Sequence, residues 1–350
     1  MSANLTTRLY QTRVRRLAVG IGISMAIAFG VGWPLAFMSP MLVASFLAAP
    51  TPRPPLIALI AMPLMILGGF LLALGIASVG LSTPLLAILT VSLLIFRCFY
   101  QLAQGRNKMF LMWALIGILI IPVVSLDSMT VGLYLTIAIF KSGVIAMAFV
   151  WLAHVLVPDP PEAVAAAAKK PMPKVDPWAA AKFAFIRTLM LLPLVSWILF
   201  TQGTDKVKIL IFSAILALSP GLDAGGKGKG LVVSNLVAGF VSLVVYEALV
   251  LCPSIVFLVL LFVFLALFCG RQIFGGGKWA QLCASGFGTV ILLTGLGTMP
   301  VGGDVDEQFY TRILQLLAAA IYMQFAYRVA GYVLQRKARR HEGRMAAATG

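Results

Sequence analysis

The segment 158-PDPPEAVAAAAKKPMPKVDPW-178 interrupts a chain of 350 residues close to its midpoint. Its prolines, alanines and lysines are typical of an exposed connector rather than of a packed domain. On both sides of this segment the sequence consists almost entirely of apolar runs. The chain is therefore predicted to have two hydrophobic halves joined by a short linker.

The composition indicates a membrane protein. Hydrophobic residues make up 61% of the chain and charged residues 11%, with a mean hydropathy of +1.01. A soluble globule of this length would need more polar surface. Lys and Arg outnumber Asp and Glu by 27 to 11, but they lie at the ends of the apolar runs, where basic residues set membrane topology. We therefore expect an all-α polytopic membrane protein and no binding to nucleic acid.

Apolar runs of about 20 residues are long enough to cross a bilayer as helices. The runs in the first half are 17–33, 35–50, 55–78, 82–104, 108–126 and 129–156. Those in the second half are 181–201, 206–220, 230–250, 253–270, 279–298 and 307–335. We expect about twelve transmembrane helices, divided into a cytoplasmic N-terminal segment 1–16, a first membrane half 17–157, a cytoplasmic linker 158–180, a second membrane half 181–335 and a basic cytoplasmic tail 336–350.

The distribution of basic residues predicts the orientation. With the N-terminus inside, the outer segments contain only Lys206, Lys208 and Arg312 among the basic residues. Because basic residues favour cytoplasmic loops, both termini are predicted to be cytoplasmic.

A weak internal repeat supports the division into halves. A shift of 170 or 171 positions aligns Arg16 with Arg187, Pro50 with Pro220, Cys98 with Cys269, Gln101 with Gln272, Gly105 with Gly275 and Lys108 with Lys278. Because each half has an even number of expected helices, the two copies would be parallel repeats related by an axis along the membrane normal.

Lys141 is the sharpest candidate for a functional residue, because it lies near the middle of the expected helix 129–156. A lysine at that depth costs a few kcal/mol on insertion scales, so we expect it to face the bundle interior or a wet cavity and to pair with a negative group. That group could be an anionic substrate, or it could be Glu247 in a purely structural pair. Glu247 is also the candidate for proton coupling, although a carboxylate near the outer surface is an equally simple interpretation.

The second expected helix of each half is short, and the two end at Pro50 and Pro220. Matched short or broken helices often line transport sites, although a plain cytoplasmic turn explains both prolines as well. Together with Lys141, Tyr134 on the same helix and Ser219 beside Pro220, they complete the set of expected substrate-binding residues. With two histidines in the whole chain and no catalytic cluster, the sequence predicts no metal, no cofactor and no enzymatic activity.

Arg13 to Arg16 lead into a Gly/Ala-rich helix, GWPLAFMSPMLVASFLAAP follows at 32–50, and the six-helix block recurs after the linker. This pattern resembles the fusaric acid resistance protein-like (FUSC) superfamily of bacterial inner-membrane proteins, which includes the aromatic acid exporters. The resemblance implies export of small aromatic carboxylates or related organic anions, driven by the proton gradient. It also implies a periplasmic membrane-fusion adaptor and an outer-membrane channel as partners.

Three other functions stay open at this point. The chain could be a permease for another class of substrate or for uptake, since the sequence does not give the direction of transport. It could be a membrane component that docks a partner without transporting anything, or an enzyme acting on lipid. A homo-oligomer is one alternative for its assembly state.

Overall fold

The computed structural model is helical wherever it shows regular structure. It describes residues 3–33, 35–49, 53–80, 83–105, 108–125, 128–160, 176–201, 227–277 and 279–297, and the single positions 318, 321, 322, 325 and 326. Ten helices are defined in these ranges: α1 (Ala3–Val31), α2 (Met38–Ala48), α3 (Leu56–Gly80), α4 (Pro84–Ala103), α5 (Lys108–Val124), α6 (Met129–Leu156), α8 (Pro177–Thr201), α10 (Lys227–Leu251), α11 (Ile255–Gly275) and α12 (Ala280–Gly297). The predicted all-α class is confirmed.

Six of the described helices are long and apolar enough to cross a membrane. Their spans are Thr7–Val31, Leu56–Ser78, Leu85–Ala103, Met129–Leu156, Pro177–Thr201 and Ile255–Gly275. In hydrocarbon the backbone polar groups must be satisfied within each segment, and only helices and closed barrels achieve this. The chain is a multi-pass membrane protein with six candidate spans in its described part.

The expected and observed helix bounds agree closely except at the N-terminus. Helix α6 has the predicted bounds 129–156, but α1 begins at Ala3 instead of residue 17. The first residues were expected to precede the membrane half, yet their arginines are good helix formers and continue the helix. The expected helix 206–220 and most of 307–335 lie outside the described residues.

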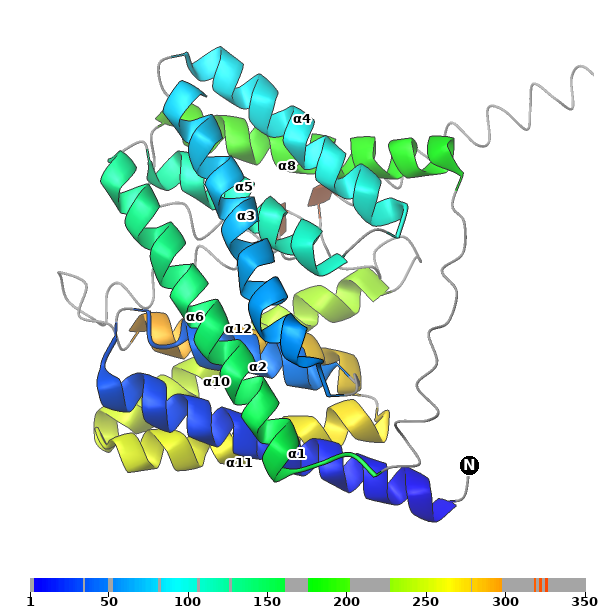
Figure 1. Cartoon of the computed structure of the whole chain (residues 1–350), viewed down its shortest axis with the longest axis vertical. Coiled ribbons are helices and arrows are strands. Elements are labelled where there is room, and N and C mark those ends of the chain that lie inside the picture. The colour runs from blue at the N-terminus through cyan, green and yellow to red at the C-terminus, as the bar shows by residue number, and fades with distance from the viewer. Residues whose placement is uncertain are drawn as a thin grey trace, which may run out of the picture.

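The helices pack into a bundle with two flanking pairs (Figure 1). Helix α1 lies along α11 on one flank, and α4 lies along α8 on the opposite flank. Between the flanks, α3 packs on α5 and α6, and α10 packs on α12. A continuous apolar core runs through both halves of the sequence and includes Leu17, Phe70, Ile198 and Phe262.

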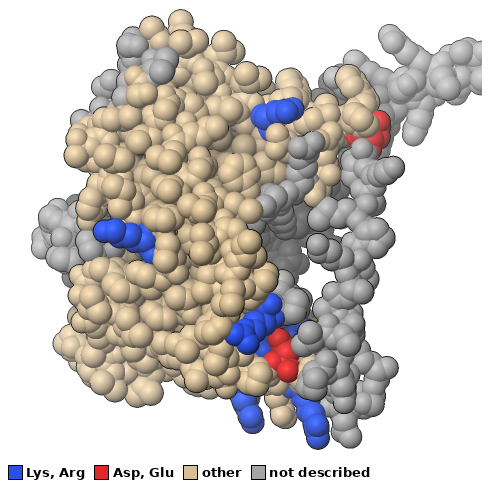
Figure 2. Space-filling view, viewed as in Figure 1, with Lys and Arg blue, Asp and Glu red and all other residues tan. Residues whose placement is uncertain are grey.

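Charged side chains are sparse on the face shown in Figure 2. The visible charged groups lie mainly at the centre and right of this view. The rest of the visible described surface is uncharged, as expected for a surface in contact with lipid.

A buried ion pair ties α1 to the segment that follows α6. Arg16 Nη2 lies 2.7 Å from Asp159 Oδ1, and the two side chains are 4% and 9% exposed. Arg16 also donates from Nε and Nη2 to the carbonyl oxygen of Val157, at 3.0 and 2.9 Å. The end of α6 is thereby fixed against α1.

Helices α3 and α5 approach each other closely at Gly69. A methyl group placed on Gly69 would lie 2.8 Å from Ala114 Cα. Gly75, on the exposed side of the same helix, would have nothing within 4 Å of such a group.

We predict that Gly69→Ala lowers the free energy of unfolding by about 1–3 kcal/mol, because the added methyl group forces the two backbones apart. Gly75→Ala is the matched control and should not destabilise the protein. Thermal unfolding of both variants in detergent measures the difference, and equal melting temperatures would contradict the observed packing.

We also predict that Asp159→Ala lowers the free energy of unfolding by about 3–5 kcal/mol, because it leaves the buried Arg16 charge without its partner. The double variant Arg16→Leu/Asp159→Ala should recover most of that loss, since it removes both charges together. The same unfolding assay gives the comparison. A double variant less stable than Asp159→Ala would show that the pairing is not the source of the effect.

Candidate anion-binding site

Helix α6 carries the candidate site and presents two different faces. The Ser128 hydroxyl caps its N-terminus by accepting a hydrogen bond from the Thr130 N–H at 3.2 Å. One face packs into the bundle through the buried residues Gly132, Thr136, Ile139, Gly143, Ala146 and Val150. The opposite face, which we call the exposed stripe, consists of Thr130, Tyr134, Ile137, Lys141, Val144 and Ala148 at helical spacing.

Lys141 lies in the middle of the exposed stripe and not on the packed face of α6. It was expected to face the bundle interior or a wet cavity. Within the described part of the chain its ammonium group makes no ion pair and no hydrogen bond. The structural pair with Glu247 is therefore not formed in this structure.

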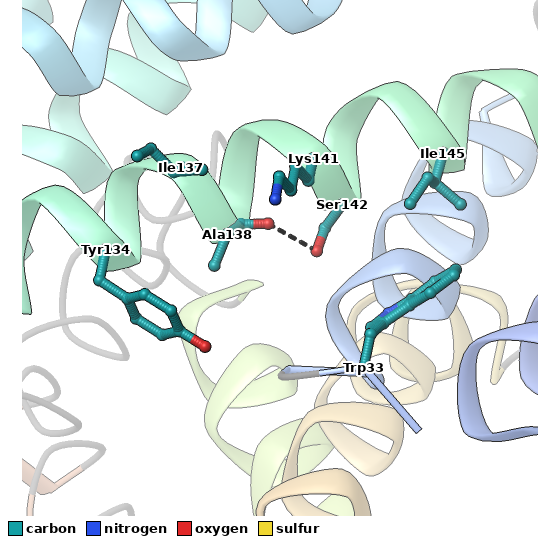
Figure 3. Close-up of a pocket in the computed structure, with 7 residues that line it drawn as sticks. All are labelled: Trp33, Tyr134, Ile137, Ala138, Lys141, Ser142 and Ile145. Carbon is teal, nitrogen blue, oxygen red and sulfur yellow. Dashed lines mark hydrogen bonds between the residues drawn. The ribbon is translucent and has the colours of Figure 1, made fainter. Parts of the chain in front are cut away.

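A cavity of about 170 Å³ adjoins Lys141 (Figure 3). Its lining residues are Trp33, Tyr134, Ile137, Ala138, Lys141, Ser142 and Ile145. All of them except Trp33 come from α6, and Trp33 comes from the turn after α1. Lys141 and Tyr134, which the sequence predicted as substrate-binding residues, both line this cavity, and their role stays a prediction. The sequence did not indicate Trp33.

Three polar groups of this cavity lack a hydrogen-bond partner in the described structure, and one of them, the Trp33 indole N–H, is buried. The Ser142 hydroxyl is occupied, because it donates to the Ala138 carbonyl oxygen at 2.9 Å. The Lys141 ammonium, the hydroxyl of the 55% exposed Tyr134 and the indole N–H of Trp33 have no hydrogen-bond partner in the described structure. Two of these groups can only donate, so the cavity suits a ligand that accepts hydrogen bonds and carries negative charge.

The turn that carries Trp33 has strained backbone. Gly32 has φ of 64°, which glycine adopts freely, but Leu35 has φ of 58°, where its Cβ crowds the backbone. Such a conformation costs about 1 kcal/mol or more and is found most often at functional sites. It places the Trp33 indole against the same cavity as Lys141.

The remaining candidate residues are not brought to this cavity. Glu247 is exposed on α10 and does not line it. Pro50, Ser219 and Pro220 lie outside the described residues, so their expected roles stay predictions.

A second membrane cation, Arg187, entered the sequence analysis only as the repeat partner of Arg16. It is 2% exposed within α8. Its guanidinium group lies 4.1 Å from the ring centre of Phe183 and 5.9 Å from that of Phe99. Contact with two aromatic faces stabilises a cation in an apolar core, and only the Phe183 contact is local in the sequence.

We predict that Lys141→Leu raises the thermal stability of the unliganded protein, because an unpaired charge in a spanning helix costs about 2–3 kcal/mol on insertion scales. Lys182→Leu is the control, since Lys182 is an exposed lysine near the start of α8. Melting temperatures in lipid nanodiscs measure both effects. A destabilising Lys141→Leu would show that the ammonium group already has a stabilising partner.

Comparison with known proteins gives one match. Residues 13–153 match a family model described as "Protein of unknown function (DUF2955)". The matched segment runs from α1 into α6 and contains every residue that lines the cavity. No curated protein and no solved structure matches the chain. The resemblance to the fusaric acid resistance protein-like superfamily stays a prediction.

Proposed function

We propose that this protein is a bacterial inner-membrane transporter that exports small organic anions such as aromatic carboxylates. Both termini would be cytoplasmic, and the proton gradient would drive export. A periplasmic adaptor and an outer-membrane channel would carry the substrate onward. The chain would act without catalytic chemistry of its own.

The observation that carries this proposal is the Lys141 ammonium group, which has no partner within the described residues and lies beside a cavity that Tyr134 and Trp33 help to line. A carboxylate would accept hydrogen bonds from the ammonium group and offset its charge. The surrounding apolar medium strengthens such an attraction relative to water. The aromatic side chains of Tyr134 and Trp33 supply surfaces on which a planar ring can pack.

The size of the cavity indicates the size of the substrate. A cavity of about 150 Å³ holds one benzene molecule, and the cavity beside Lys141 measures about 170 Å³. It therefore has room for one aromatic ring near the ammonium group. This favours single-ring acids over larger fused systems.

We further propose twelve helices arranged as two parallel repeats. A shift of 171 positions superimposes the bounds of α3 on those of α10 and the first residue of α4 on that of α11. The same shift relates the left-handed glycines Gly105 and Gly276, which have φ of 72° and 65°. It also relates Arg16 to Arg187, which are 3% and 2% exposed.

The packing of the flanking pairs supports the same symmetry. Shifting by one repeat turns α1 into α8 and α11 into α4, so the pair α1–α11 becomes the pair α8–α4. It likewise turns α3–α5 into α10–α12. In the sequence, this shift pairs Lys141 with the basic residue Arg312, which lies outside the described residues.

Glu247 stays the candidate for proton coupling. It is the only acidic residue within the helices that the structure describes. Because it does not line the cavity, it would exchange protons at a separate position from the anion site.

We predict that Lys141→Ala lowers the rate of benzoate export at least about tenfold, because it removes a charge-assisted hydrogen bond worth roughly 1.5–3 kcal/mol. Lys141→Arg should keep a substantial part of the activity, since it preserves the charge. The measurement is efflux of labelled benzoate from an efflux-deficient bacterial strain, with the adaptor co-expressed and membrane levels of each variant matched.

Lys182→Ala is the matched control and should export at the parental rate. Parental export by Lys141→Ala would remove Lys141 from the mechanism. If the parent exports no aromatic acid while correctly inserted, the protein is instead a docking component. Uptake in oriented vesicles would identify a permease.

A further inference from the structure

We propose that the Lys141 site opens sideways to the bilayer and takes its anion from the lipid phase rather than from water. This inference rests on the proposed function. It adds the route by which the substrate enters, from the bilayer, and the chemical class of that substrate. The ligand would be an amphipathic carboxylate, with its acid group at Lys141 and its apolar body along the exposed stripe of α6.

The position of Lys141 on its helix is the first argument. It lies near the middle of a 28-residue membrane span, where an aqueous surface is distant on both sides. Its neighbours on the stripe are apolar and open to the outside of the bundle, with Ile137 and Val144 both 42% exposed. An approach to Lys141 along this face passes over apolar side chains.

The shape of the cavity is the second argument. Of its lining residues, Tyr134, Ile137 and Lys141 belong to the exposed stripe, whereas Ser142 is buried. The cavity thus lies at the exposed side of α6. A substituent that does not fit its volume of about 170 Å³ can extend outward into lipid.

The energetic balance is the third argument. An unpaired ammonium group facing hydrocarbon is costly, so a carboxylate that arrives within the bilayer gains by neutralising it. Water competes weakly for either charge at this depth, which strengthens the pair. The apolar body of the ligand would stay in lipid and would lose no favourable solvation on binding.

Binding of two carboxylates tests the route. The full chain is placed in nanodiscs of phosphatidylcholine and titrated with benzoate and with 4-octylbenzoate. The octyl chain concentrates the acid in the bilayer. The apparent Kd of 4-octylbenzoate, expressed as its concentration in water, should therefore be at least about tenfold lower than that of benzoate. Lys141→Ala should abolish binding of both acids, and Lys182→Ala should leave both unchanged.

Photolabelling locates the tail. A benzoate with an eight-carbon chain ending in a diazirine is photolysed in the same discs, and the labelled residues are mapped by mass spectrometry. The label should fall on stripe residues such as Ile137 and Val144, and not on packed residues such as Ile139 and Ala146. Excess 4-octylbenzoate should prevent this labelling, because it competes for the same site.

The outcomes separate the two proposals. If benzoate binds through Lys141 but 4-octylbenzoate does not, or if the tail labels the packed face, the lateral route is overturned and the transport proposal survives. The route is also overturned if stripe labelling in discs disappears in native membranes, because another chain would then cover the stripe. If neither acid binds in a Lys141-dependent manner, the proposed function fails together with this inference.

Discussion

The cost of placing charge in hydrocarbon is the constraint on which this structure depends. It is met differently at three cations of the candidate spans, Arg16, Arg187 and Lys141. Arg16 has a carboxylate and a carbonyl oxygen within hydrogen-bond distance, and Arg187 is enclosed by aromatic rings. Lys141 has no such partner within the described structure. Among these three cations Lys141 departs from the pattern, and such departures are where function is expected.

Hydropathy predicted the helices well because it depends only on local sequence. The bounds of α6 were predicted without error, and the other described helices differ mainly at their ends. Helix α1 extends to Ala3, through the arginine-rich segment that was expected to precede the first membrane span, and Arg16 pairs there with Asp159. That partner is distant in sequence, and no local pattern indicates such a contact.

The cavity, too, includes a contact between residues distant in sequence, which sequence patterns do not predict. Lys141 and Tyr134 are seven positions apart on one helix, so sequence spacing could place them on one face. Trp33 reaches the site through the turn after α1, where Leu35 adopts a left-handed backbone. Neither the strain nor the contact follows from residue type alone. The orientation of Lys141 toward the outside also required the packing of α6, because its burial pattern is set by neighbouring helices.

The flanking pairs restrict how access to such a site can change. Helix α1 belongs to the first half of the sequence and packs along α11 of the second, while α8 of the second packs along α4 of the first. Moving one whole half against the other would separate both pairs and expose the apolar surfaces between them, at a cost of about 25 cal/mol per Å². In the turn after α1, Gly32 is exposed and Trp33 and Leu35 are partly exposed, whereas Phe37 and most of α2 are buried. Movement at the mouth of the Lys141 cavity is therefore expected to be local and confined to the start of the turn that carries Trp33.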